Sequence, residues 1–116
     1  MKKLIPLIIT LLFSCKVKDK YGKEIPKNLS PILIKEILNS PKEYQNKDIL
    51  ITGKIVAECG SGCWFFIKDE TGQIYVDLAP SHFAIPQRIG KEVIVYGKVE
   101  IKNGEPLIIG KGLKFK

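Results

Sequence analysis

The sequence is poor in the residues that build metal centres and catalytic sites. It contains one histidine, three cysteines and one methionine in 116 residues. One histidine excludes a histidine-rich metal centre and argues against a multi-ligand cluster. No glycine-rich phosphate loop occurs, and the adjacent acids Asp69 and Glu70 belong to a turn motif that accounts for them. We therefore expect no catalytic residues, no bound metal and no cofactor, and a binding protein rather than an enzyme.

Long hydrophobic runs are also absent, because a membrane-spanning helix takes roughly 20 apolar residues. The apolar run Leu4–Phe13 is shorter, follows two lysines and has the size of the hydrophobic region of a signal peptide. It ends in Leu-Phe-Ser-Cys at residues 12–15, which resembles the lipobox of bacterial lipoproteins. The resemblance implies a signal peptide over residues 1–14 and lipidation of Cys15. An ordinary secretory signal, with Cys15 incidental, is the alternative.

The lipoprotein interpretation predicts a cellular location and a first partner, the membrane. We expect an exported protein of the cell envelope, held to a membrane through a lipid at Cys15 and facing the periplasm or the exterior. The net charge of +7 comes from 19 Lys+Arg against 12 Asp+Glu, and part of it lies in the signal peptide. Much of the rest lies in residues 15–29, a lysine-rich stretch that we expect to be a mobile tether.

Residues 30–45 carry the signals of a short amphipathic helix. Ser30 and Pro31 suit the N-cap and the first helical position, and the apolar stripe ends at Asn39-Ser40-Pro41. We expect one more helical turn over Pro41–Tyr44. The stripe needs an apolar surface to cover, and the expected place is one end of the folded domain; it consists of Leu33, Ile34, Ile37 and Leu38.

From Asp48 onward the hydrophobic period changes to two, which is the period of β-strands. Strands are expected over residues 48–59, 63–68, 73–78, 92–101 and 107–115, with an irregular or helical insert over residues 79–90. Asn103-Gly104 is a strong two-residue hairpin turn. Glycines inside the strands suit the sharp bends of a small barrel. The predicted fold class is all-β: a five-stranded Greek-key OB-fold barrel over residues 46–116.

Three segments carry a resemblance to small OB domains. They are NKDILITGKI at residues 46–55, FIKDETGQIYV at residues 66–76 and YGKV at residues 96–99. Over about residues 46–112 the chain resembles the bacterial OB-fold proteins of the periplasm and the anticodon-binding type of OB domain. The resemblance implies the barrel and a binding surface on the outside of the second and third strands. It does not name a ligand.

The turns predict which residues face the barrel interior. If Cys59 pairs with Cys63 across Gly60-Ser61-Gly62, and Ile67 pairs with Ile74 across the next turn, all inward pairs are apolar. The further inward pairs are Ile55–Ile67, Ala57–Phe65, Phe65–Val76 and Cys63–Leu78.

The same register places aromatic and basic residues on the outer face. Phe66 then lies across from Tyr75, and Trp64 across from Asp77. Aromatic stacking and lysine–phosphate contacts suit an oligonucleotide-like or oligosaccharide-like ligand. A surface covered by the helix, or a dock for another envelope protein, is the alternative. The candidate binding residues are Lys54, Trp64, Phe66, Lys68 and Tyr75, with loop contributions from His82 and Arg88.

With Cys15 assigned to lipidation, two cysteines remain. Cys59 and Cys63 flank a three-residue turn, so a structural disulfide is geometrically plausible and suits an exported protein. A metal or redox site, with His82 as a third ligand, and a pair of free thiols are the alternatives.

Overall fold

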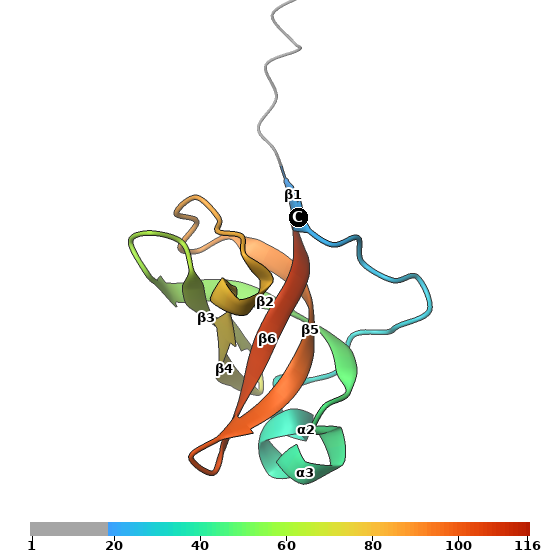
Figure 1. Cartoon of the computed structure of the whole chain (residues 1–116). Helices are drawn as coiled ribbons and strands as arrows, with labels where there is room; N and C mark the ends of the chain where they lie inside the picture. Colours follow the sequence, from blue (N-terminus) through green and yellow to red (C-terminus); the bar gives the residue numbers. More distant parts are fainter. Residues whose placement is uncertain (1–18) are drawn as a thin grey trace, which may run out of the picture.

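The computed structural model describes residues 19–116 as a closed β-barrel (Figure 1). The strands are β1 (Lys20–Gly22), β2 (Asp48–Glu58), β3 (Trp64–Asp69), β4 (Gly72–Asp77), β5 (Glu92–Lys102) and β6 (Glu105–Phe115). Helices α2 (Ile34–Asn39) and α3 (Pro41–Tyr44) precede β2, and a 3₁₀ helix, η1 (Ala79–Ser81), follows β4. The order β1-β6-β4-β3-β2-β5 closes through a β5–β6 pairing. Strands β2–β6 form the five-stranded barrel that the sequence predicts, and the predicted signal peptide and Cys15 lie outside the described residues.

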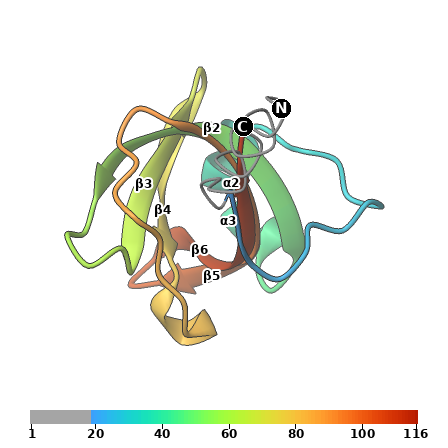
Figure 2. The same ribbon diagram turned by 90° about the horizontal axis from the view of Figure 1, so that it is seen from above.

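The core fills the barrel and continues under the helices. Alternate residues of each strand point inward, and Figure 2 shows the strands surrounding this interior. Helices α2 and α3 cover one end of the barrel, where the fully buried Ile34 and Ile37 join the core (Figure 1). The predicted end-capping helix is confirmed. Within residues 19–116, no helix has the length and apolar character needed to cross a membrane.

Two features of the barrel wall position the candidate site. At the β5–β6 register shift, a Cβ on Gly97 would overlap the backbone of Ile109, so a glycine permits the close approach that the bend requires. Strands β4 and β6 run parallel and share only two register pairs, Val76–Ile108 and Asp77–Ile109. Nearer the helices, residues 73–75 of β4 and 105–107 of β6 are paired with β3 and β5 but not with each other, and they line a groove between them.

The helix starts later than predicted. Ser30 and Pro31 are not its first residues, because Pro31 forms a β-bridge with Leu50 and the helix begins at Ile34. Its free N–H groups are capped from the β3–β4 turn: the Ile34 N–H donates to Asp69 Oδ2 at 2.9 Å, and the Lys35 N–H donates to Thr71 Oγ1 at 3.0 Å. The local capping contact is the Leu33 N–H donating to Glu36 Oε2 at 3.3 Å, and the caps of Ile34 and Lys35 come from about 35 residues away.

Replacing Asp69 by alanine is expected to lower the free energy of unfolding by about 2 kcal/mol at neutral pH, because the helix loses its cap and the turn loses its carboxylate. Partial burial acts to raise the pKa of Asp69, but hydrogen bonds from the Thr71 hydroxyl and from the N–H groups of Ile34, Thr71 and Gly72 lower it below 3.8 overall. The stabilisation is therefore present above pH 3.8 and is lost as the pH falls through the folded-state pKa.

Urea unfolding of both proteins between pH 7 and pH 2.5 measures this effect. The exposed neighbour Glu70, replaced by alanine, is the control and should change stability by less than about 0.5 kcal/mol. An Asp69→Ala deficit that persists unchanged at pH 2.5 would contradict the capping role.

Part of the predicted tether is attached to the barrel. Lys20–Gly22 forms β1 and pairs antiparallel with Gly112–Lys114 of β6. The pairing continues at both ends, because the Phe115 N–H donates to the Asp19 carbonyl and the Lys23 N–H donates to the Lys111 carbonyl. The sequence does not predict this pairing, because β1 is three residues long, mostly exposed and lies in a lysine-rich segment.

A β-bulge in β2 corrects the predicted register at the tip of the β2–β3 hairpin. Ile55 pairs with Ile67 as predicted, but Ala57 pairs with Phe66 and not with Phe65. The extra residue is Val56, and beyond it the inward and outward positions of β2 exchange. Cys59 therefore lies opposite Trp64, to whose carbonyl its N–H donates at 3.0 Å, and is not a direct partner of Cys63.

Candidate functional site

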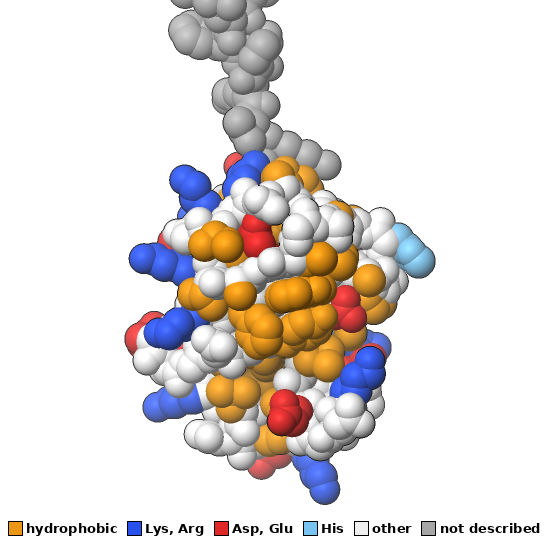
Figure 3. Space-filling view, turned by 90° about the vertical axis from the view of Figure 1, so that its left-hand side faces the viewer, with side chains coloured by type: hydrophobic (Ala, Val, Ile, Leu, Met, Phe, Trp, Pro, Cys, Tyr) orange, Lys and Arg blue, Asp and Glu red, His pale blue; other side chains and the backbone are white. Residues whose placement is uncertain are grey.

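Three aromatic rings meet on the outer side of the β3–β4 hairpin. The Trp64 ring stacks on the Tyr75 ring with centroids 5.6 Å apart, and Phe66 contacts Tyr75 and Trp64 edge to face at 5.4 and 6.1 Å. All three side chains are half-buried, whereas Phe65, between two of them, is fully buried. We call Trp64, Phe66 and Tyr75 the aromatic cluster. Hydrophobic side chains gather over the middle of the face that β3 and β4 present (Figure 3).

Charged residues border the aromatic cluster at its two ends. Lys54 of β2 pairs with Lys68 of β3, and Lys68 pairs with Gln73 of β4. Both lysines are exposed. Asp77 pairs with Trp64 at the other end of the hairpin. A ligand lying along the hairpin therefore meets two lysines at one end, with Glu92 as the partner of Lys54 on β5, and Asp77 at the other.

Tyr75 keeps its proton at neutral pH. Burial raises the pKa of its hydroxyl above 10.0, and the negative charges of Asp77, Cys63 and Cys59 raise it further. The hydroxyl is therefore a hydrogen-bond donor at the edge of the aromatic cluster.

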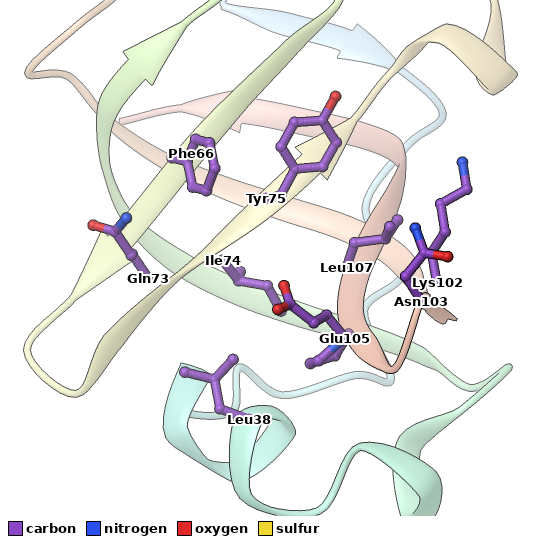
Figure 4. A pocket seen from close by; sticks show the side chains of 10 residues that line it. Leu38, Phe66, Gln73, Ile74, Tyr75, Lys102, Asn103, Glu105 and Leu107 are labelled. Atoms are coloured by element: carbon purple, nitrogen blue, oxygen red, sulfur yellow. The ribbon is translucent and has the colours of Figure 1, made fainter.

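A groove of about 620 Å³ adjoins the aromatic cluster. In Figure 4, Phe66 and Tyr75 form one end, Leu38 of α2 lies at the opposite end, and the β5–β6 turn forms a side wall. Leu38 remains 38% exposed although it belongs to the capping helix. The lining is Leu38, Phe66, Gln73, Ile74, Tyr75, Lys102, Asn103, Glu105, Pro106 and Leu107.

The sequence alone does not predict most of this groove. The sequence predicts the turn at Asn103-Gly104 and the strand Gln73–Leu78 but not that they lie side by side. Their proximity follows from the parallel β4–β6 pairing, which joins segments about 30 residues apart. The interrupted alternation at Pro106 in the last strand is the one weak signal, because proline inside a strand marks an edge or a break in pairing.

The structure places the two predicted loop residues away from the ring contacts of the aromatic cluster. Arg88 is half-buried, with its guanidinium carbon 4.8 Å from the centre of the Phe115 ring, and its backbone N–H donates to the Glu58 carboxylate at 2.9 Å. His82 is exposed, ends η1 and adopts a left-handed φ of 61°. These contacts give Arg88 a role in holding the loop 82–91 to the barrel.

The cysteine hairpin holds two thiols and not the predicted disulfide. The Sγ atoms of Cys59 and Cys63 are 3.5 Å apart, well beyond the bond length of about 2.05 Å. Within residues 19–116, no group of three or more histidine, cysteine, aspartate or glutamate side chains could hold a metal ion.

Comparison with solved structures shows the class of fold. The hypothetical protein ygiW from E. coli superposes with a TM-score of 0.56 at 18% identity, covering 83% of this chain and 100% of that one. Asparaginyl-tRNA synthetase from Pyrococcus horikoshii superposes with a TM-score of 0.62 at 17% identity, covering 75% of this chain and 23% of that one. The same enzyme complexed with asparaginyl-adenylate gives a TM-score of 0.61.

Together with the closed five-stranded barrel, these similarities define the chain as an OB-fold protein. The chain spans about a quarter of the length of the synthetase. No family model matches the sequence, and no curated protein is similar enough to count as a relative.

Proposed function

We propose that this protein is a non-enzymatic binding module that holds a chain ligand with flat rings, an oligonucleotide or an oligosaccharide, on the aromatic cluster and its groove. One observation carries the proposal: three half-buried rings are in mutual contact, and two of them, Phe66 and Tyr75, line a groove of about 620 Å³. Stacking on such rings contributes about 1–3 kcal/mol per base in proteins that bind single strands. The same surface of OB barrels binds oligonucleotides and oligosaccharides.

The polar groups around the rings suit both kinds of chain. Lys54, Lys68 and Lys102 can pair with phosphates, and their contribution weakens as the salt concentration rises. Gln73 and Asn103 offer amide groups to hydroxyls or base edges. The synthetase among the similar structures acts on a tRNA, which is consistent with a nucleic-acid ligand but shows the fold alone.

We also propose that the protein acts in the cell envelope. The support is the signal-like run Leu4–Phe13 and the lipobox-like residues 12–15. A protein anchored there at Cys15 meets glycans, peptides and lipids before it meets nucleic acid, so glycans belong in any test of its ligand.

Replacing Trp64 by alanine is expected to weaken binding about 10- to 100-fold, because a stacking ring is lost. The measurement is fluorescence titration with single-stranded oligonucleotides and with glycan fragments, using intrinsic Trp64 emission for the wild type and a labelled ligand for the variants. Ile94, a half-buried residue of β5 outside the groove lining, replaced by alanine is the matched control.

The salt dependence separates the two ligand classes. A single-stranded nucleic acid loses affinity with a log–log slope of about −0.7 per phosphate contacted, and Lys54→Gln/Lys68→Gln should reduce the slope by about 1.4. A neutral glycan shows almost no slope. The proposal fails if no oligonucleotide or glycan binds, or if Trp64→Ala binds as tightly as the wild type.

A second candidate function is docking of another envelope protein on the same face. The observation that favours it is the end of the groove at α2, where the apolar Leu38 side chain is 38% exposed (Figure 4). Cross-linking from position 38 in intact cells tests it: a discrete protein adduct that disappears in Trp64→Ala/Phe66→Ala supports docking, and its absence removes it.

A further inference from the structure

The tip of the β2–β3 hairpin brings two thiols close together, with a serine hydroxyl between them. The Sγ atoms of Cys59 and Cys63 lie 3.5 Å apart. The Ser61 hydroxyl lies between them, 3.1 Å from Cys59 Sγ and 3.4 Å from Cys63 Sγ. Both cysteines are half-exposed, so a reagent in solution can reach them.

Backbone hydrogen bonds hold this arrangement in place. The Gly62 N–H donates to the Cys59 carbonyl at 2.9 Å, which closes the turn. The Leu78 N–H donates to the Cys63 carbonyl at 2.9 Å, and the Ile85 N–H donates to the Gly62 carbonyl at 3.1 Å. The hairpin tip is thus fixed to β2, to the end of β4 and to the loop 82–91. An S–S bond of about 2.05 Å requires the two sulfurs to approach each other by about 1.5 Å.

The two thiols are not equivalent. Hydrogen bonding of Cys59 with the Ser61 hydroxyl, with the Ser61 backbone N–H and with Cys63 favours a charged sulfur and outweighs burial, so the pKa of Cys59 is lowered to about 7. A substantial fraction of Cys59 is therefore thiolate at neutral pH, and the thiolate is the form that attacks disulfides. Cys63, which donates to it, is placed as the second thiol.

We propose that Cys59 and Cys63 form a reversible redox couple that exchanges with disulfides, with Cys59 as the attacking sulfur and Cys63 as the resolving one. The activity is separate from ligand binding and does not rest on the proposed function. The oxidant is a low-molecular-weight disulfide R–S–S–R of the glutathione disulfide class.

The exchange balances in two steps. The Cys59 thiolate attacks one sulfur of R–S–S–R, forms a mixed disulfide with it and releases R–S⁻, which takes up the proton that Cys59 gave to solvent. Cys63 then loses its proton, its sulfur attacks Cys59 Sγ, and the second R–S⁻ leaves and is protonated. Two protein thiols are oxidised to one disulfide, and R–S–S–R is reduced to two R–SH.

The couple adjoins the aromatic cluster, which supplies a spectroscopic reporter. Cys63 directly precedes Trp64, and the Cys59 N–H is bonded to the Trp64 carbonyl. Negative charge on either sulfur raises the pKa of Tyr75. Oxidation therefore changes the surroundings of the one tryptophan, and Trp64 emission is expected to report the redox state.

The test uses the full chain with Cys15→Ser, so that two thiols remain. The protein is equilibrated at pH 7 with a series of ratios of reduced to oxidised glutathione, and free thiols are counted by maleimide–polyethylene glycol shift and intact mass. We expect complete, reversible conversion to a form lighter by two hydrogens, with a parallel change in Trp64 emission. Thiols that stay reduced in oxidised glutathione, or that are protected by added Zn²⁺ without ever forming a disulfide, would overturn the proposal.

Three variants test the assigned roles. Cys63→Ser should stop at the mixed disulfide on Cys59, and Cys59→Ser should react at least about tenfold more slowly with glutathione disulfide. Ser61→Ala, which keeps both thiols and the backbone turn, should slow the first step several-fold at pH 7 and much less at pH 9.5. Equal rates for the two single-cysteine variants would contradict the assignment. If one of them fails to fold, an unchanged rate in Ser61→Ala would still contradict it.

Discussion

Truncating Phe65 to alanine is expected to lower the free energy of unfolding by about 4 kcal/mol, whereas the same change at Phe66 should cost about 1 kcal/mol. Phe65 is 0% exposed, so its removal leaves a cavity in the barrel core. Phe66 is half-buried and loses mainly its edge-to-face contact with Tyr75, an interaction of about 0.5–1.5 kcal/mol. Urea unfolding monitored by circular dichroism measures both changes.

The order of the two variants should be reversed when ligand affinity, rather than stability, is measured. Phe66→Ala should remain folded and lose affinity for the chain ligand, while any folded fraction of Phe65→Ala should keep it. Because the residues are neighbours in sequence and identical in type, they control for each other. Equal losses of stability at both positions would show that the outer ring is packed inside the protein, and the aromatic cluster would then not be a binding surface.

Replacing Gly62 by alanine is expected to cost about 3 kcal/mol of stability and to separate the two thiols. Gly62 has a φ of 77°, which L-residues adopt only with strain, and a Cβ there would overlap the carbonyl oxygen of Ile85. The hairpin tip must then move away from the loop 82–91. We expect the exchange with glutathione disulfide to slow at least about tenfold, because the two sulfurs, 3.5 Å apart in the wild type, move away from each other.

Substitutions at two other glycines separate the cost of backbone strain from the cost of overlap between an added Cβ and its neighbours. Gly60 in the same turn has open space around it, and Gly60→Ala should change stability by less than about 0.5 kcal/mol. Gly104 has a φ of 81° but no atom near its missing Cβ, so Gly104→Ala should cost about 1 kcal/mol from strain alone. A Gly62→Ala cost no larger than that of Gly104→Ala would show that the contact with Ile85 is unimportant.

The residues of two hairpin turns made the strand pairing of the barrel predictable. Asn103 and Gly104 adopt φ values of 53° and 81°, as their hairpin turn requires, and they set the β5–β6 pairing. Asp69 accepts hydrogen bonds from Thr71 and Gly72 within its own turn, and this sets the β3–β4 register. Because that register was predictable, so was the pairing of Phe66 with Tyr75, and with it the aromatic cluster.

Contacts between distant segments account for what could not be predicted. The bulge at Val56 has no sequence signal, because an apolar residue there fits either face of the strand. The helix start depends on Asp69, and the groove depends on the parallel pairing of β4 with β6. The lowered pKa of Cys59 needs the Ser61 hydroxyl in one particular position. In each case the residue types are ordinary, and the geometry that gives them a role comes from elsewhere in the chain.

The pairing of β1 with β6 limits how far the barrel can stand from an anchor at Cys15. The Asp19 carbonyl is already bonded to Phe115, so only residues 16–18 separate the anchor from the fold. Four extended peptide steps span about 14 Å. Helices α2 and α3 lie at the other end of the barrel from β1 (Figure 1). If Cys15 carries a lipid, the barrel stays within about 14 Å of its anchor, and helices α2 and α3 form the end of the barrel away from the attachment point.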